Sequence, residues 1–155
     1  MPVLVLAFLI GVVAGLRALT PVAAVSWAAW ADWLNLQGTP LGFLRYIVSP
    51  VVFTIMALGE IVNDKLPKTP SRKAPASFGV RIVMGAFSGT ALGAASQSLL
   101  GGLVMGALGA VVGTFAGYEA RMRLTRALGG RNLPIALLED LVAIIVAVAI
   151  VVQFK

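Results

Sequence analysis

The sequence predicts an all-α membrane protein with about six transmembrane helices. Composition is the first reason: 59% of the 155 residues are hydrophobic and only 12% are charged, whereas about 25% of a typical soluble domain is charged. Second, long apolar stretches alternate with short polar segments along the whole chain. Third, most of the Lys and Arg residues lie in two clusters between apolar stretches, which is typical of cytoplasmic loops under the positive-inside rule.

The first element, residues 3–36, is an apolar stretch that is too long for one span and barely long enough for two. Arg17 and Pro21 interrupt it near its middle. A buried arginine is costly in hydrocarbon, and a proline breaks a helix. We therefore predict two short spans hinged at residues 17–21, with a re-entrant hairpin as the alternative.

Four more spans follow. Each is bounded by charge, Gly or Pro and has roughly the length of about 20 residues that a membrane helix needs. A turn at Gly101-Gly102 is expected to join the middle two into a hairpin. The four predicted spans are residues 41–62, 79–99, 102–118 and 134–152.

The two basic clusters predict the orientation. If both are cytoplasmic, the protein is a multi-pass protein of the bacterial inner (cytoplasmic) membrane, and both termini lie outside. Three tryptophans then form an aromatic belt on the outer side, where Arg45 is the one base apart from the C-terminal Lys155. Because the bases flank apolar segments, we expect the net charge of +6 to meet lipid head groups and not nucleic acid. The clusters are Lys65, Lys68, Arg72 and Lys73, and Arg121, Arg123, Arg126 and Arg131; the tryptophans are Trp27, Trp30 and Trp33.

We expect one transmembrane domain with two three-helix halves, residues 1–62 and 79–155, joined by a basic cytoplasmic connection, residues 63–78. Three spans followed by three spans give halves of opposite orientation, and such a 3+3 inverted-topology bundle underlies many transporters. Two short echoes accompany this arrangement, although they lie at different depths in their spans. Gly15-Leu-Arg17 is similar to Gly79-Val-Arg81, and Ala57-Leu-Gly-Glu60 is similar to Ala136-Leu-Leu-Glu139.

Many glycines recur at intervals of four residues. Residues four apart share one helix face, so each row predicts a groove in which another helix backbone approaches closely. We expect this glycine-zipper packing to hold the bundle together, in preference to forming a pore between copies in a homo-oligomer. The rows are Gly11 and Gly15; Gly85, Gly89 and Gly93; Gly102 and Gly106; and Gly109, Gly113 and Gly117.

A few polar residues are expected to meet at one membrane level between the two halves. One acid pair lies near the cytoplasmic end of the third span, and the other lies near the start of the sixth. The members of the first pair share a helix face because they are four residues apart. The candidate site for an ion or substrate consists of Glu60, Asp64, Glu139, Asp140, Arg17 and Thr20.

Glu60 lies at a helix C-terminus, where the helix dipole disfavours a negative charge. It therefore needs a compensating base, a proton or a bound cation. Arg17, Lys65 and Arg81 are the available bases, so a buried ion pair and a cation or proton site both stay open. Glu60 and Asp64 are the candidate ligands of any metal, since carboxylates and free helix-end carbonyls suit hard cations.

The second acid pair, Glu139 and Asp140, follows Pro134 near a helix N-terminus, where the dipole favours negative charge. A capping role therefore explains this pair as well as a functional role does. In the connection between the halves, bases and a hydroxyl offer contacts for an anion or a lipid head group, although a plain positive-inside loop explains them too. These residues are Lys65, Lys68, Thr69 and Arg72.

Three runs of residues together resemble the bacterial membrane family catalogued as domain of unknown function 4126. The runs are GLRALTP at residues 15–21, EIVNDKLPKTPSR at 60–72 and LPIALLED at 133–140. This resemblance implies an integral membrane protein and supplies no activity. A weaker similarity links residues 60–65 to cation/proton antiporters with Glu-x-Gly-Asp-Lys-Thr motifs. The chain departs from that motif because Asn63 stands in place of the glycine and because the second half contains no copy.

The sequence therefore favours a secondary transporter or channel for a small ion or solute, with a small cation or proton as the expected partner. Two alternatives stay open: a structural or assembly protein that uses its glycine grooves to pack with partners, and a metal-dependent enzyme that acts on lipid head groups. No catalytic motif is recognised, and the absence of Cys and His excludes thiolate and imidazole chemistry. The sequence identifies no cofactor.

Overall fold

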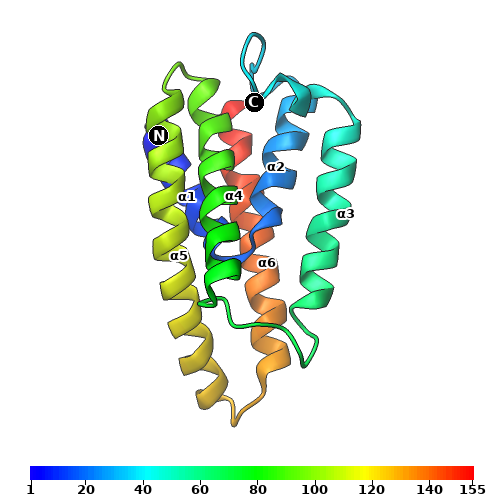
Figure 1. Cartoon of the computed structure of the whole chain (residues 1–155), viewed down its shortest axis with the longest axis vertical. Helices are drawn as coiled ribbons and strands as arrows, with labels where there is room; N and C mark the ends of the chain where they lie inside the picture. The colour runs from blue at the N-terminus through cyan, green and yellow to red at the C-terminus, as the bar shows by residue number, and fades with distance from the viewer.

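The computed structural model describes residues 1–155 and is entirely helical, which confirms the all-α part of the prediction (Figure 1). Six α-helices and two short 3-10 helices follow one another along the chain. The α-helices are α1 (Val3–Leu16), α2 (Leu19–Trp30), α3 (Val48–Asn63), α4 (Pro75–Ala94), α5 (Leu99–Ala127) and α6 (Asn132–Val151); the 3-10 helices are η1 (Gly42–Arg45) and η2 (Val152–Phe154).

Consecutive helices run in opposite directions along one bundle, so both termini lie near the same end (Figure 1). The first two helices form a hairpin that packs against α4, α5 and α6. Both are short, because 14 and 12 residues correspond to about 21 and 18 Å of helix. Gly15, near the tip of this hairpin, lies against Gly113 and Thr114. The tip therefore ends partway along α5, which continues to Ala127.

The glycine rows lie where α1, α4 and α5 pack together. A Cβ added to Gly89 would come closer than 3.0 Å to backbone atoms of Gly102 and Gly106, and one added to Gly113 would collide with the backbone of Val12. Such close approach maximises van der Waals contact between helices. The grooves are thus filled by helices of the same chain. Similar backbone collisions would occur at Gly11, Gly15, Gly85, Gly93 and Gly109.

The outer surface of the bundle is apolar. Large exposed hydrophobic side chains recur on α3, α5 and α6, such as Ile55, Val112 and Ile145. Two helices, α5 and the segment Asn132–Phe154 that contains α6, are long and apolar enough to cross a membrane, while α1, α2 and α3 are apolar but shorter. An apolar exterior of this extent is typical of proteins that contact lipid or another apolar surface.

The structure moves several predicted boundaries. The third span was predicted to include the segment Gly42–Arg45, but that segment is a 3-10 helix and α3 begins only at Val48. The turn predicted at Gly101-Gly102 is wrong, because the chain turns at residues 95–98 and both glycines lie in α5. Gln97 takes a positive φ of 58° in this turn. Glycine is common in turns, but here both glycines belong to a packed helix.

A further correction concerns the length of α5, which was predicted as residues 102–118. The helix runs to Ala127, so most bases of the second cluster, including Arg121, lie on the helix and not in a loop. The prediction followed the apolar run and stopped at the first charges, yet arginine is a good helix former. The connection to α6 is correspondingly short, residues 128–131.

Candidate functional site

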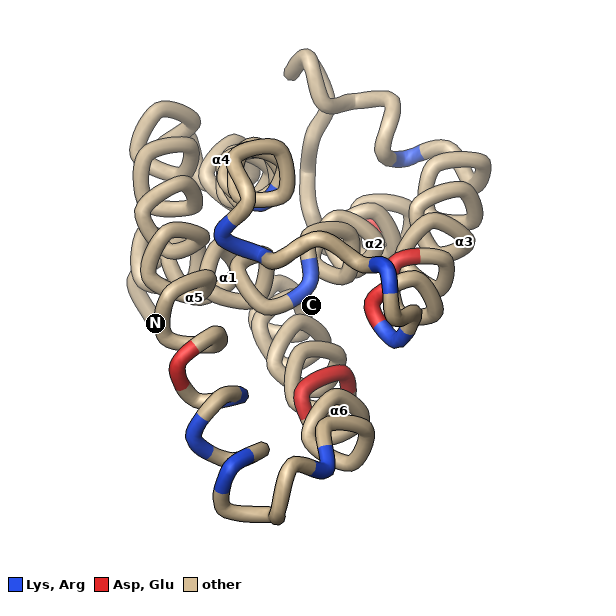
Figure 2. The backbone as a smooth tube through the Cα atoms, turned by 60° about the horizontal axis from the view of Figure 1, so that its bottom comes forward, with Lys and Arg blue, Asp and Glu red and all other residues tan.

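Charged residues gather at the end of the bundle that lies away from the termini (Figure 2). They come from the tip of the α1–α2 hairpin, the α3–α4 connection, and the neighbouring parts of α4, α5 and α6. The connection was predicted as residues 63–78 but is residues 64–74, because Pro75 is the first residue of α4. A proline is tolerated there, since its missing N–H would have no helical partner.

The helical hairpin turns at Arg17, whose extended backbone (φ −140°, ψ 111°) ends α1. The predicted break thus occurs at Arg17 and Ala18. Pro21 was expected to take part in it but lies in the first turn of α2, where a proline is tolerated. The break leaves the last carbonyls of α1 and the first N–H groups of α2 without helical partners.

Arg81 of α4 satisfies the carbonyls at the end of α1. Its Nη1 donates hydrogen bonds to the carbonyl oxygens of Gly15 at 2.9 Å and Leu16 at 2.8 Å. The helix dipole places partial negative charge at this end, so a cation stabilises it. Arg81 is buried, which makes these bonds a strong constraint on the hairpin tip.

Glu60 of α3 satisfies the N–H groups at the start of α2. The amides of Ala18 and Leu19 donate to its two carboxylate oxygens, both at 2.8 Å, and Arg81 Nη2 lies 4.0 Å from Oε1. The N-terminus of α2 favours the negative charge that the C-terminus of α3 disfavours. Arg17, one of the bases considered for Glu60, forms no ion pair with it. The compensating group is therefore mainly a helix N-terminus.

Arg17 is the centre of a buried charge network. Its side chain is fully buried, with Nε donating to Asp140 Oδ1 at 2.5 Å and Nη2 donating to Asp64 Oδ2 at 2.9 Å. Lys65 Nζ donates to the other oxygen of Asp140, also at 2.5 Å. Charges persist in such surroundings only when they are paired and hydrogen-bonded. The network therefore ties the hairpin tip to the connection and to α6.

Arg121 and Arg72 extend the network from α5 and the connection. Arg121 Nη1 donates to Asp64 at 2.9 Å and lies 3.5 Å from Glu139 Oε2, while its Nε donates to Asn132 at 2.9 Å. Both terminal nitrogens of Arg72 bond to the carboxylate of Glu139, in the two-pronged geometry that arginine forms with carboxylates. Each of the three acids in this network is thus shared between two bases.

Neither acid of α6 caps its helix, so the capping interpretation is wrong. The helix begins at Asn132, which makes Glu139 and Asp140 its eighth and ninth residues, beyond the turn that has free N–H groups. Both acids are instead partners of bases from other segments. The prediction placed them about one turn into the span, but they lie about two turns in.

Asp64 lies just beyond α3, and its acidity is strongly altered. Burial by itself would raise the pKa of this carboxyl, but the hydrogen bonds and charges of Arg17 and Arg121 outweigh burial and hold the pKa well below its ordinary value. The carboxylate is therefore ionised at neutral pH and links the two arginines.

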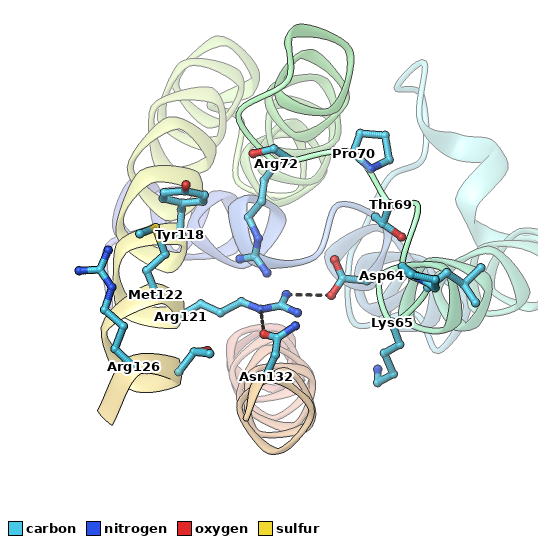
Figure 3. Close-up of a pocket in the computed structure, with 14 residues that line it drawn as sticks. Asp64, Lys65, Thr69, Pro70, Arg72, Tyr118, Arg121, Met122, Arg126 and Asn132 are labelled. Carbon is cyan, nitrogen blue, oxygen red and sulfur yellow. Dashed lines mark hydrogen bonds and ion pairs between the residues drawn. The ribbon is translucent and has the colours of Figure 1, made fainter. Parts of the chain in front are cut away.

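A pocket of about 570 Å³ opens beside the network, between the connection, the end of α5 and the start of α6 (Figure 3). Arg121 reaches across it from α5 towards Asp64, and the guanidinium group of Arg72 points towards Arg121 (Figure 3). The charged side chains of its lining are four bases and one acid, so the lining is positive. These are Lys65, Arg72, Arg121 and Arg126, with Asp64.

A second pocket of about 360 Å³ adjoins the first. Asp64 and Arg72 line both, and they stand between the two spaces. The second pocket extends to Leu19 and Glu60 at the start of α2 and to Arg81 of α4. The two pockets together run from the end of the bundle to the tip of the hairpin.

Most of the predicted site residues meet in this region. The buried hydroxyl of Thr20, however, has no hydrogen-bond partner. Thr69 lines both pockets while its hydroxyl bonds to the carbonyl of Asn63. Lys68 is exposed and lines neither pocket. The predicted residues that the structure joins through ion pairs or helix-end contacts are Arg17, Glu60, Asp64, Lys65, Arg72, Glu139 and Asp140.

Arg121 is the site residue that sequence reasoning missed, because it counted only as one base of a cytoplasmic cluster. Tyr118 and Thr125, which line the same pocket, lie three and four residues from it and share its helix face. That pattern is visible in the sequence once α5 is continued past its apolar part. Its partner Asp64 lies 57 residues away, so no local pattern connects the two.

No group of three or more His, Cys, Asp or Glu side chains is placed to hold a metal ion. Glu60 and Asp64, the candidate metal ligands, direct their oxygens at N–H groups of the backbone and of arginines. No family model, curated protein or solved structure matches this chain.

Proposed function

We propose that this chain is a multi-pass protein of the bacterial inner membrane and serves as a secondary transporter or channel for a small charged solute. In this proposal α3 to α6 span the bilayer, and α1 and α2 enter it as a re-entrant hairpin from the outer side. The hairpin helices measure about 21 and 18 Å and α3 about 24 Å, against about 30 Å of hydrocarbon. The irregular backbone at the hairpin tip is enclosed by protein, as membrane depth requires.

The observation that carries this proposal is the buried charge network around Arg17. Charged groups among apolar helices are costly and mark ion or substrate pathways in membrane proteins. Helix ends that meet at a break, as those of α1 and α2 do, are typical of transporter binding sites. The network also joins the two halves of the chain, because Arg17 and Asp64 pair with Asp140 and Arg121 of the second half.

The sharing of acids between bases supports movement of the halves relative to each other. If Arg121 leaves Asp64, that acid keeps Arg17; if Arg17 leaves Asp140, that acid keeps Lys65. A rearrangement of this kind avoids an unpaired buried charge, which would be strongly destabilising. Rocking of one half against the other around a fixed site is the usual basis of alternating access.

Two alternative functions receive less support. An assembly protein would offer its glycine grooves to partners, whereas Gly89 and Gly113 face backbone of this same chain. A metal-dependent lipid enzyme needs several free oxygen ligands, whereas the acids of the network are bound by bases and helix N–H groups.

The proposal extends to membership of the family of unknown function 4126. The three runs that carry the resemblance, residues 15–21, 60–72 and 133–140, lie far apart in the sequence. All three contribute to the network: Arg17 comes from the first run, and its partners Asp64 and Asp140 come from the second and third. A shared site in the family would account for this convergence.

Flux into proteoliposomes tests the transport proposal. Folded wild-type protein should accelerate the uptake of at least one solute from a panel of small anions, cations and zwitterions. Asp64→Asn should strongly reduce that uptake, because it removes the link between Arg17 and Arg121. Asp32→Asn is the matched control: Asp32 pairs with Arg45 at 2.7 Å outside the network, so uptake should be unchanged. Wild-type protein that moves no member of the panel would refute transport.

A further inference from the structure

We infer that the larger pocket binds an anion of the phosphate class, either inorganic phosphate or a phosphate ester, between Arg72 and Arg121, with the exposed Arg126 at the edge of the pocket. This assignment rests on the proposed function and names the class of its solute. The proposed solute is thus an anion, and not the cation or proton that the acid pairs alone suggest. The phosphate of a soluble molecule and that of a lipid head group share the chemistry that the pocket offers.

The balance of charge at the pocket favours an anion. Four bases of the network share three acids, which leaves a positive surplus. One further base, Arg126, lines the pocket without any ion pair. Positive charge in a partly buried site is unfavourable until an anion completes it. The paired groups are Arg17, Lys65, Arg72 and Arg121 with Asp64, Glu139 and Asp140.

Two hydrogen-bond donors at the pocket or next to it lack acceptors. Arg17, which is 0% exposed and lines neither pocket, donates to Asp64 of the lining through Nη2, while its Nη1 has no hydrogen-bond partner. The hydroxyl of Thr125, which lines the pocket, is also buried and unpartnered. Buried donors are nearly always satisfied in native proteins, and the oxygens of a phosphate are strong acceptors for them.

The shape of the pocket suits a phosphate that carries an organic group. Its volume of about 570 Å³ lies within the range of about 300–1,000 Å³ that is usual for small-molecule sites. Arg72 and Arg121 enter it from different segments, and the guanidinium group of Arg72 points towards that of Arg121 (Figure 3). Guanidinium groups bind phosphate oxygens through paired hydrogen bonds. Tyr118 and Met122 add aromatic and apolar surface on the α5 side.

A cation fits the same space poorly. Asp64 is the only acid in the lining, and it already accepts hydrogen bonds from two arginines. Both oxygens of Glu60, in the adjoining pocket, accept from backbone N–H groups. A cation would therefore have to displace these donors and remain close to four positive side chains.

Thermal unfolding of the purified full-length protein in detergent tests the assignment. Inorganic phosphate should raise the Tm saturably, because a ligand bound by the native state alone stabilises it. Chloride at equal ionic strength, and sodium or manganese added as chlorides, should not. Arg126→Gln should weaken the apparent affinity for phosphate about two- to fivefold, through the loss of one exposed charge at the edge of the pocket. This variant should keep the wild-type Tm without phosphate, because Arg126 makes no ion pair.

Arg123→Gln is the matched control. Arg123 lies on the same helix, outside the pocket, and pairs only with exposed Glu119. Its replacement should leave the apparent affinity for phosphate at the wild-type value. Equal loss of affinity in the Arg123 and Arg126 variants would indicate general surface charge and overturn the pocket assignment.

Nanodiscs distinguish the two sources of phosphate. If a lipid head group is the ligand, nanodiscs containing phosphatidic acid should raise the Tm above that in phosphatidylcholine, with a smaller rise for Arg126→Gln and little effect of inorganic phosphate. Stabilisation by sodium or manganese ions alone, or by none of these probes, overturns the anion assignment. A protein that transports cations and ignores phosphate would refute the anion while retaining the transport function.

Discussion

Arg17, Glu60 and Arg81 act together at one break between two helices. Arg81 satisfies the end of α1, Glu60 satisfies the start of α2, and Arg17 ties the break to acids from elsewhere in the chain. Electrostatic interactions are strong in such buried surroundings, and unpaired groups are correspondingly unfavourable. The position of the hairpin tip therefore depends on individual charged side chains as well as on apolar packing.

Glu60→Gln should destabilise the protein by about 1–3 kcal/mol. The amide has one acceptor oxygen, so one of the Ala18 and Leu19 N–H groups loses its acceptor, and the N-terminus of α2 loses its compensating charge. Adding Arg17→Gln should not restore stability, because Arg17 pairs with other acids. A double-mutant cycle on the free energy of unfolding in detergent measures this. Restored stability in the double variant would contradict the observed contacts.

Acid should destabilise the protein partly through Asp64. Its pKa is lower in the folded state than in the unfolded state, so its stabilising contribution is complete above about pH 4 and is lost as the pH falls below that value. Asp64→Asn cannot titrate, so its Tm should fall less than the wild-type Tm between about pH 6 and about pH 3. Parallel loss of Tm in both proteins would show that Asp64 is not the titrating group.

Helix α5 takes part both in the close helix packing and in the charge network. Its first half packs through glycine against α1 and α4, and its second half carries Arg121 to the charge network. Both functions need one continuous helix, because the register of the glycines sets which face of the second half meets the pocket. The closely packed half thus positions the polar half.

Gly89→Leu should destabilise the bundle by about 1–3 kcal/mol or more, because the side chain would have to displace the backbone of Gly102 and Gly106. Gly79→Leu is the matched control on the same helix: no atom lies within 4 Å of a Cβ added there. Its stability should stay close to the wild-type value. Thermal unfolding in detergent measures both, and equal Tm values for the two variants would argue against close packing at Gly89.

For the whole molecule, charge and apolar surface are separated along the bundle. The network and most bases lie at one end (Figure 2), whereas exposed apolar side chains cover the sides of α3, α5 and α6. At the other end, Arg45 is neutralised by Asp32. In the proposed topology this ion pair lies on the outer side of the membrane, where the positive-inside rule leaves few bases.

Cysteine labelling tests the orientation that follows. The chain contains no cysteine, so single variants need no altered background. In intact cells a membrane-impermeant reagent should label Lys155→Cys, at the end near the termini, but not Ser71→Cys in the connection. Both positions are exposed, which makes them a matched pair. Labelling of Ser71→Cys and not of Lys155→Cys would reverse the topology.

The hinge region and the acids illustrate what local sequence can predict. An arginine and a proline inside an apolar stretch indicated a break near Arg17, and the structure has one there. The predicted turn at Gly101-Gly102 is wrong, because both glycines lie within α5, where glycine serves helix packing. The capping interpretation of Glu139 is wrong, because α6 begins at Asn132, about two turns before this residue.

By itself, the sequence determined the all-helical class, the approximate positions of the helices and most of the charged residues that meet. Apolar stretches, and the charges that interrupt them, can be recognised locally in a sequence. Only the tertiary structure decided which groups pair. Glu60 meets a helix N-terminus 41 and 42 residues away, and Arg17 meets an acid 123 residues away. Such pairs depend on how helix faces pack, so no short stretch of sequence contains them. The tertiary structure also gathered four bases around one pocket, and this arrangement is the basis of the proposed anion site.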